Sequence, residues 1–149
     1  MDDATEAALA KELGILLKAT QAALHHRMDE ALRPLGLTVS QYACLSTLRA
    51  EPGITGSELA RRTFVSRQSM NVLVQGMERQ GLVDRAEEPG PRRERAVAPT
   101  PAGTAALAVA ESRVAEVTAR MLGRLGAAER MALRDALVAS RDALLAGDD

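Results

Sequence analysis

The sequence of 149 residues has almost no aromatic side chains, with one Phe, one Tyr and no Trp. A core must therefore be aliphatic, and the many Ala and Leu residues, strong helix formers, favour a mainly helical fold. A single cysteine, Cys44, excludes an internal disulfide. No apolar run approaches the ~20 residues of a membrane span, and the N-terminus lacks a signal-peptide pattern. We therefore expect a cytoplasmic protein with no membrane partner.

Groups for catalysis or metal binding are also scarce. The chain has no phosphate-binding loop, no nucleophile elbow and only two His residues, so we expect no enzyme, no cofactor, and no catalytic or metal site. His25 and His26 are adjacent and would point about 100° apart on a helix, a poor arrangement for a metal. Cys44 lies among apolar residues, and we expect it to be buried. A redox- or metal-responsive protein stays an alternative.

The net charge of −1 is unevenly distributed. Residues 1–60 carry 5 basic and 8 acidic side chains (net −3), residues 61–95 carry 8 and 5 (net +3), and residues 96–149 carry 6 and 7 (net −1). The positive middle segment allows a surface that faces phosphates. Seventeen of the 19 basic residues are Arg, which suits bidentate contacts with phosphate or guanine, although a GC-rich genome gives the same bias.

Apolar residues at spacings of three and four predict six helices. Thr38 or Ser40, Thr55 and Ser66 are placed to cap three of them. After Gly81 the apolar period changes to two, which predicts a β-hairpin, here called the wing (residues 82–98), with a mobile tip rich in Pro and charge. The expected helices cover residues 5–33, 38–49, 55–62, 67–80, 101–121 and 127–146, and the expected strands cover 82–86 and 95–98.

Two short helices followed directly by a hairpin are typical of a winged helix-turn-helix, in which the second helix reads the major groove. On that helix, we expect Met70, Val72 or Leu73, Val74 and Met77 to pack in the core. We expect the remaining polar residues and the wing arginines to bind DNA, through base edges, phosphates or the minor groove. The candidate DNA-binding residues are Ser66, Arg67, Gln68, Ser69, Asn71, Gln75, Arg92, Arg93 and Arg95. The alternatives are solvated polar surfaces, or a winged helix that docks on protein.

Five segments in this order resemble the MarR family of bacterial transcriptional regulators. They are LTVSQYACL (37–45), SELA (57–60), VSRQSM (65–70), MERQGLV (77–83) and TPAG (100–103). The match spans residues 35–103. Two positions depart from the family pattern: Pro91 replaces an Asp that usually helps to hold the wing Arg, and Pro99 replaces an apolar strand residue and is expected to remove a ladder donor.

The resemblance implies one MarR-like domain over residues 1–149, with a DNA-binding lobe at 37–100 and dimerisation helices at 5–33 and 101–146. It also implies a homodimeric repressor of a pseudo-palindromic double-stranded operator, released by a small phenolic or lipophilic effector. The effector pocket is expected between the dimerisation helices and the lobe. Its candidate residues are Gln21, His25, Met28 and Tyr42.

Overall fold

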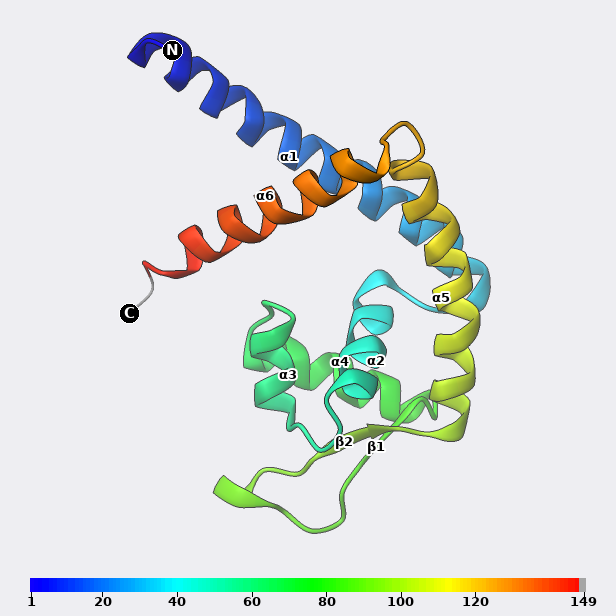
Figure 1. Ribbon diagram of the computed structural model, residues 1–149. Coiled ribbons are helices and arrows are strands. Elements are labelled where there is room, and N and C mark those ends of the chain that lie inside the picture. Colours follow the sequence, from blue (N-terminus) through cyan, green and yellow to red (C-terminus); the bar gives the residue numbers. More distant parts are fainter. Residues whose placement is uncertain (148–149) are drawn as a thin grey trace. The chain divides into compact units, whose positions relative to one another are not determined.

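A computed structural model of the protein describes residues 1–147 and has the predicted order of six helices and one hairpin (Figure 1). The chain falls into two units, residues 1–117 and the segment from residue 118, with α5 running across the division. The elements are α1 (Asp3–Leu32), η1 (Arg33–Leu35), α2 (Val39–Ala50), α3 (Gly56–Arg62), α4 (Arg67–Arg79), β1 (Val83–Arg85), η2 (Pro91–Arg93), β2 (Val97–Pro99), α5 (Pro101–Met121) and α6 (Ala127–Leu145).

Side-chain caps fix where the helices of the lobe begin. The Thr38 hydroxyl accepts a hydrogen bond from the Gln41 backbone N–H at 3.1 Å, and the Gln41 side chain accepts one in return from the Thr38 N–H at 3.0 Å. The hydroxyls of Thr55 and Ser66 accept from the backbone N–H groups of Glu58 and Ser69 and so cap α3 and α4, as predicted. Each cap pairs a backbone N–H that a helix end would otherwise leave without a partner.

The core of the first unit is aliphatic, as the lack of aromatics requires. Leu45 of α2, Leu59 of α3, Met77 of α4 and Leu107 of α5 are fully buried. In Figure 1, α2, α3 and α4 gather above the two strands, and Val83 adds a buried side chain from β1. Each such side chain contributes about 1.5–3 kcal/mol through its burial, so this packing holds α4 in place.

The strands are shorter than predicted, and the second begins two residues later. Val83 pairs with Pro99 and Arg85 pairs with Val97 in an antiparallel ladder. Ala96 also forms a bridge with Thr55, because the N–H of Val97 points away from β1 and donates to the Ile54 carbonyl at 3.0 Å. The second strand thus pairs with the segment before α3 as well as with β1.

Pro99 costs no hydrogen bond to β1, contrary to the prediction. The N–H of Ala86 donates to the Ala96 carbonyl, and the N–H of Thr100 donates to the Leu82 carbonyl. Opposed pairs in an antiparallel ladder alternate between bonded and non-bonded. Pro99 therefore occupies a non-bonded position, where its missing donor is not needed.

The start of α5 packs closely against the end of the turn that leads into β1. The Thr100 hydroxyl accepts from the Gly103 N–H at 3.0 Å and caps the helix. Gly103 is buried, and a Cβ built there would lie 2.0 Å from the Leu82 carbonyl oxygen. Only a residue without a side chain fits this approach.

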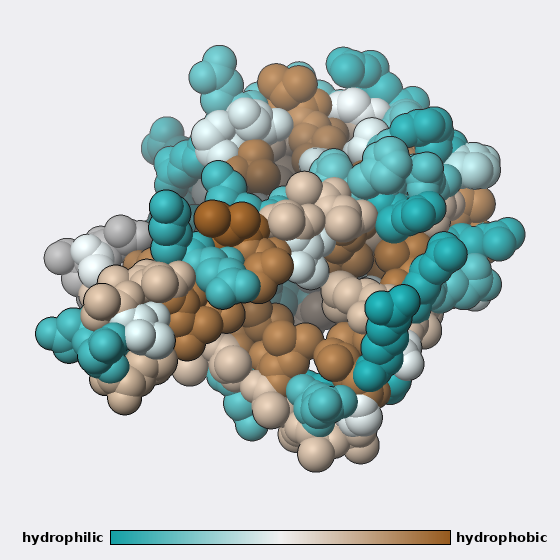
Figure 2. All heavy atoms as spheres, turned by 90° about the horizontal axis from the view of Figure 1, so that it is seen from above, coloured by the Kyte–Doolittle hydropathy of each residue, from teal (hydrophilic) through white to brown (hydrophobic). Residues whose placement is uncertain are grey.

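Helices α1 and α6, each taken by itself, leave apolar side chains open to solvent. Figure 2, which draws the molecule from above, shows hydrophobic residues in brown at the surface. Among residues 1–147 no helix is long and apolar enough to cross a membrane. The exposed apolar residues are Leu9, Leu13, Ile15, Leu16 and Leu17 on α1, and Met131, Leu133, Leu137, Leu144 and Leu145 on α6.

Candidate nucleic-acid interface

Helix α4 has a buried apolar side and an exposed side. Met70, Val74 and Met77 are buried in the core. Val72, predicted as a possible core residue, is instead 61% exposed. At about 100° per residue, Val72 points roughly 200° away from Met70, so it lies on the outer face with Gln68 and Gln75, both of which are exposed as predicted.

The N-terminus of α4 presents a second group of polar side chains. Ser66, Arg67, Ser69 and Asn71 are all exposed. The hydroxyls of Ser66 and Ser69 lie 2.9 Å apart and are hydrogen bonded to each other. Because the N-terminal end of a helix dipole is positive, a helix start of this kind suits a phosphate.

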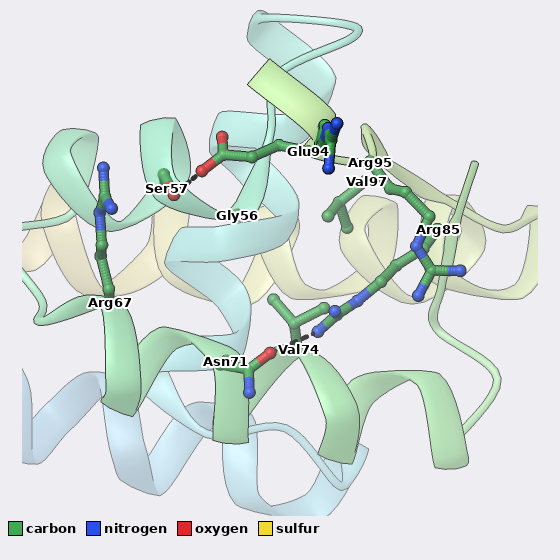
Figure 3. Close-up of a pocket in the computed structure, with 10 residues that line it drawn as sticks. Gly56, Ser57, Arg67, Asn71, Val74, Arg85, Glu94, Arg95 and Val97 are labelled. Atoms are coloured by element: carbon green, nitrogen blue, oxygen red, sulfur yellow. Dashed lines mark hydrogen bonds between the residues drawn. The ribbon is translucent and has the colours of Figure 1, made fainter. Parts of the chain in front are cut away.

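A cleft of about 330 Å³ lies between α3, the inner flank of α4 and the wing (Figure 3). Four arginines and one glutamate line it, so positive charge predominates. Of the predicted DNA-binding residues, Arg67, Asn71, Arg93 and Arg95 come together here, whereas Gln68 and Gln75 belong to the outer face. The lining residues are Gly56, Ser57, Arg67, Asn71, Val74, Arg85, Arg93, Glu94, Arg95 and Val97.

Arg85 joins α4 to the wing, and sequence reasoning missed it. Its Nη2 donates to Oδ1 of Asn71 at 2.9 Å, and its Nε lies 3.0 Å from Oε1 of Glu78. The signal was present, because Arg85 follows buried Val83 by two residues and so lies on the same, inward side of the strand. A charge on an inward face needs a partner.

Glu94 fastens the base of the wing to α3. One of its carboxylate oxygens accepts a hydrogen bond from the Ser57 hydroxyl at 2.6 Å (Figure 3). Hydrogen bonds from Ser57 and Thr55, with the nearby charges of Arg67 and Arg92, hold the pKa of Glu94 below its usual value. Glu94 therefore anchors the wing to α3.

The wing arginines sit on an unusual backbone. Arg92 and Arg93 both have positive φ, 62° and 59°, a region that costs a residue with a side chain about 1 kcal/mol or more. The Gly90 N–H donates to the Glu94 carbonyl at 2.8 Å and closes this turn. Arg92, Arg93 and Arg95 are all exposed, so their charges are available to an outside partner.

The predicted effector residues do not line this cleft. Gln21 and His25 are exposed on α1, whereas Met28 and Tyr42 are half-buried against the core. Burial, and secondarily the charge of Glu111, raises the pKa of Tyr42. Glu111 accepts two hydrogen bonds from Arg49, one of them at 2.8 Å, and so links α5 to α2. The effector role of the four residues stays a prediction.

The surroundings of Cys44 and His26 do not resemble a redox or metal site. Cys44 is 1% exposed, as predicted, and burial raises the pKa of its thiol to about 11. Its Sγ lies 3.8 Å from Sδ of Met70. Within residues 1–147 no group of three or more His, Cys, Asp or Glu side chains could hold a metal ion. His26 instead pairs with Glu30 at 3.3 Å.

Comparisons with known proteins agree with this geometry. The sequence profile of the MarR family matches residues 35–94. The HTH-type transcriptional repressor Rv2887 of Mycobacterium tuberculosis is 36% identical over 118 residues, which cover 79% of this chain and 85% of the relative.

Solved structures extend the likeness to the fold. The transcriptional repressor CouR, bound to a 23-mer DNA duplex, has a TM-score of 0.81 at 30% identity, covering 89% of this chain and 94% of that one. The Rv2887 complexes with DNA and with salicylic acid both have a TM-score of 0.68, at 34% and 35% identity, and cover 84% of this chain and 94% and 93% of theirs. Helix order, hairpin and sequence identity together place the chain in the MarR family of transcriptional regulators.

Proposed function

We propose that the protein is a homodimeric, non-catalytic, cytoplasmic repressor that binds a pseudo-palindromic operator and is released by a small aromatic acid. One observation carries the DNA-binding part: the capped start of α4 and the wing converge on a cleft lined by four arginines. Repressors related to this chain have been solved on DNA. Phosphate contacts would come from the arginines, and base contacts from the exposed polar residues of α4.

A second copy of the chain would cover the apolar side chains that α1 and α6 leave exposed. Residues 5–33 and 101–146 would form the dimer, and residues 37–100 the DNA-binding lobe. A two-fold dimer places two α4 helices in successive major grooves, so the operator half-sites would lie about one helical turn apart. Effector binding would change the separation of the two α4 helices.

The test of DNA binding removes two side chains from α4. Arg67→Ala combined with Asn71→Ala should abolish the preference for operator over random DNA in a gel-shift assay, while gel filtration still gives a dimer. Each lost base contact weakens discrimination by about 1–3 kcal/mol. Arg113→Ala, an exposed arginine on α5, is the control. Sequence-specific binding by the double variant would show that α4 is not the recognition helix.

The effector class is proposed from chemistry and from the relative Rv2887, whose structures with salicylic acid and p-aminosalicylic acid are known. Tyr42 and His25 offer hydrogen-bonding groups to a phenolic acid, and Met28 offers an apolar wall. Salicylate must bind the DNA-incompetent state more tightly, because only a difference in affinity shifts a population. A fiftyfold difference supplies about 2 kcal/mol.

Titration of the protein–operator complex with salicylate tests this effector class. We expect release from DNA at a salicylate concentration that rises in Tyr42→Phe and His25→Ala. Equal separation of the two α4 helices in crystals grown with and without salicylate would contradict the mechanism. If Arg93→Ala alone changed the response, the acid would bind in the arginine-lined cleft instead.

A further inference from the structure

We propose that Arg85 fixes the orientation of the Asn71 amide, so that Asn71 presents its N–H donors to DNA and selects a base with an acceptor edge. This inference rests on the proposed DNA-binding function and adds a specificity-determining residue to it. It also reverses the simplest expectation for Asn, which is a bidentate contact with adenine.

The chemistry of the arginine decides which way the amide faces. A guanidinium group carries only donors. The atom of Asn71 that lies 2.9 Å from Nη2 of Arg85 must therefore be the carbonyl oxygen Oδ1. Figure 3 shows the oxygen of Asn71 directed at Arg85 and its amide nitrogen directed away. The NH₂ group is then the part of the amide that an approaching base meets.

Arg85 is itself held firmly enough to impose this orientation. Asn71 and Glu78 are seven residues apart on α4, two turns along one face, and Arg85 contacts both. The side chain of Arg85 is 22% exposed and that of Glu78 is 34% exposed. The charge-assisted hydrogen bond to Asn71 on one side and the half-buried ion pair with Glu78 on the other together restrict the rotation of the guanidinium.

The consequence is a preference among bases. Adenine offers the acceptor N7 beside the donor N6, and an Asn reads both only when its oxygen is free to face N6. With Oδ1 directed at Arg85 and the NH₂ group directed outward, the amide presents donors to DNA, which suit N7 and O6 of guanine or O4 of thymine. The donors at N6 of adenine and N4 of cytosine are then unfavourable.

The experiment selects bound duplexes from a random pool and compares variants. Asn71→Ala identifies the base pair that Asn71 contacts, because the sequence preference at that position disappears in the variant. The full-length wild type should prefer guanine or thymine there by about fivefold or more over adenine. Arg85→Met frees the amide and should move the preference to adenine. Arg95→Met removes another cleft arginine and should weaken binding to all sequences alike.

A second variant keeps the test independent of how well Arg85→Met folds. Asn71→Asp preserves the acceptor for Arg85 but replaces the outward NH₂ with an oxygen, so the preference should move to cytosine, whose N4 is a donor. An adenine preference in the wild type, or a preference unchanged in both Arg85→Met and Asn71→Asp, would overturn the inference alone. A wild type that selects no sequence would overturn the proposed function together with it.

Discussion

The close packing of Gly103 against the turn before β1 predicts a large effect of one methyl group. In Gly103→Ala the new Cβ would lie 2.0 Å from the Leu82 carbonyl oxygen and 3.0 Å from its carbonyl carbon. Non-bonded atoms of this kind prefer a separation of about 3.5–4.0 Å, so the backbone must move by more than about 1 Å. The same oxygen accepts the Thr100 N–H at 3.0 Å, and that hydrogen bond would be disturbed as well.

Two opposing terms set the size of the effect. Ala is favoured over Gly in a helix by about 1 kcal/mol. Overpacking a rigid site costs about 1–3 kcal/mol, and the upper end applies because the obstacle is backbone. We expect a net loss of about 2 kcal/mol in the free energy of unfolding, or a fall in Tm of about 4–8 °C for a chain of this size.

Urea unfolding followed by circular dichroism measures this loss, at one protein concentration because the stability of the proposed dimer would depend on concentration. Gly76→Ala on α4 is the matched control, since the nearest atom to its new Cβ is the tip of Arg79 at 3.9 Å. The control should be neutral or stabilising by up to about 1 kcal/mol. If Gly103→Ala were as stable as the control, the close packing of α5 against the Leu82 carbonyl would be wrong.

Two further predictions concern single side chains. Glu94→Ala should release the wing, so that a protease cuts between residues 86 and 93 faster. Folding lowers the pKa of Glu94 from 4.5. In the wild type the contact between Glu94 and Ser57 should therefore persist above pH 4.5 and weaken as the pH falls through the pKa of Glu94 in the folded protein. Equal cleavage of wild type and variant at neutral pH would argue against the anchor. Cys44→Ser should lower the free energy of unfolding by about 1–3 kcal/mol, since the hydroxyl would be buried beside a thioether. Wild-type Cys44, whose pKa is raised to about 11, should react with thiol reagents only when the protein unfolds. Rapid labelling of the native protein would contradict its burial.

Much of the fold follows from short-range patterns. The helix starts at Thr38, Thr55 and Ser66 were predictable because a cap joins residues only three apart. The strands were placed less well, since the limits of the second strand depend on its pairing with Ile54 and Thr55, more than 40 residues earlier. The position of Val72 was ambiguous for another reason. An apolar side chain in an amphipathic helix is expected in the core unless the helix rotation of about 100° per residue places it opposite the buried side chains.

The sequence by itself determined the order of elements, the aliphatic core, the local excess of positive charge and the family to which these belong. Only the tertiary structure decided how the candidate site is connected. Arg85 meets Asn71 across 14 residues, and Glu94 meets Ser57 across 37. Both contacts depend on how α3, α4 and the wing pack together. Hydrogen bonds across such separations leave no periodic trace in a sequence, because their geometry is set by packing rather than by spacing along the chain.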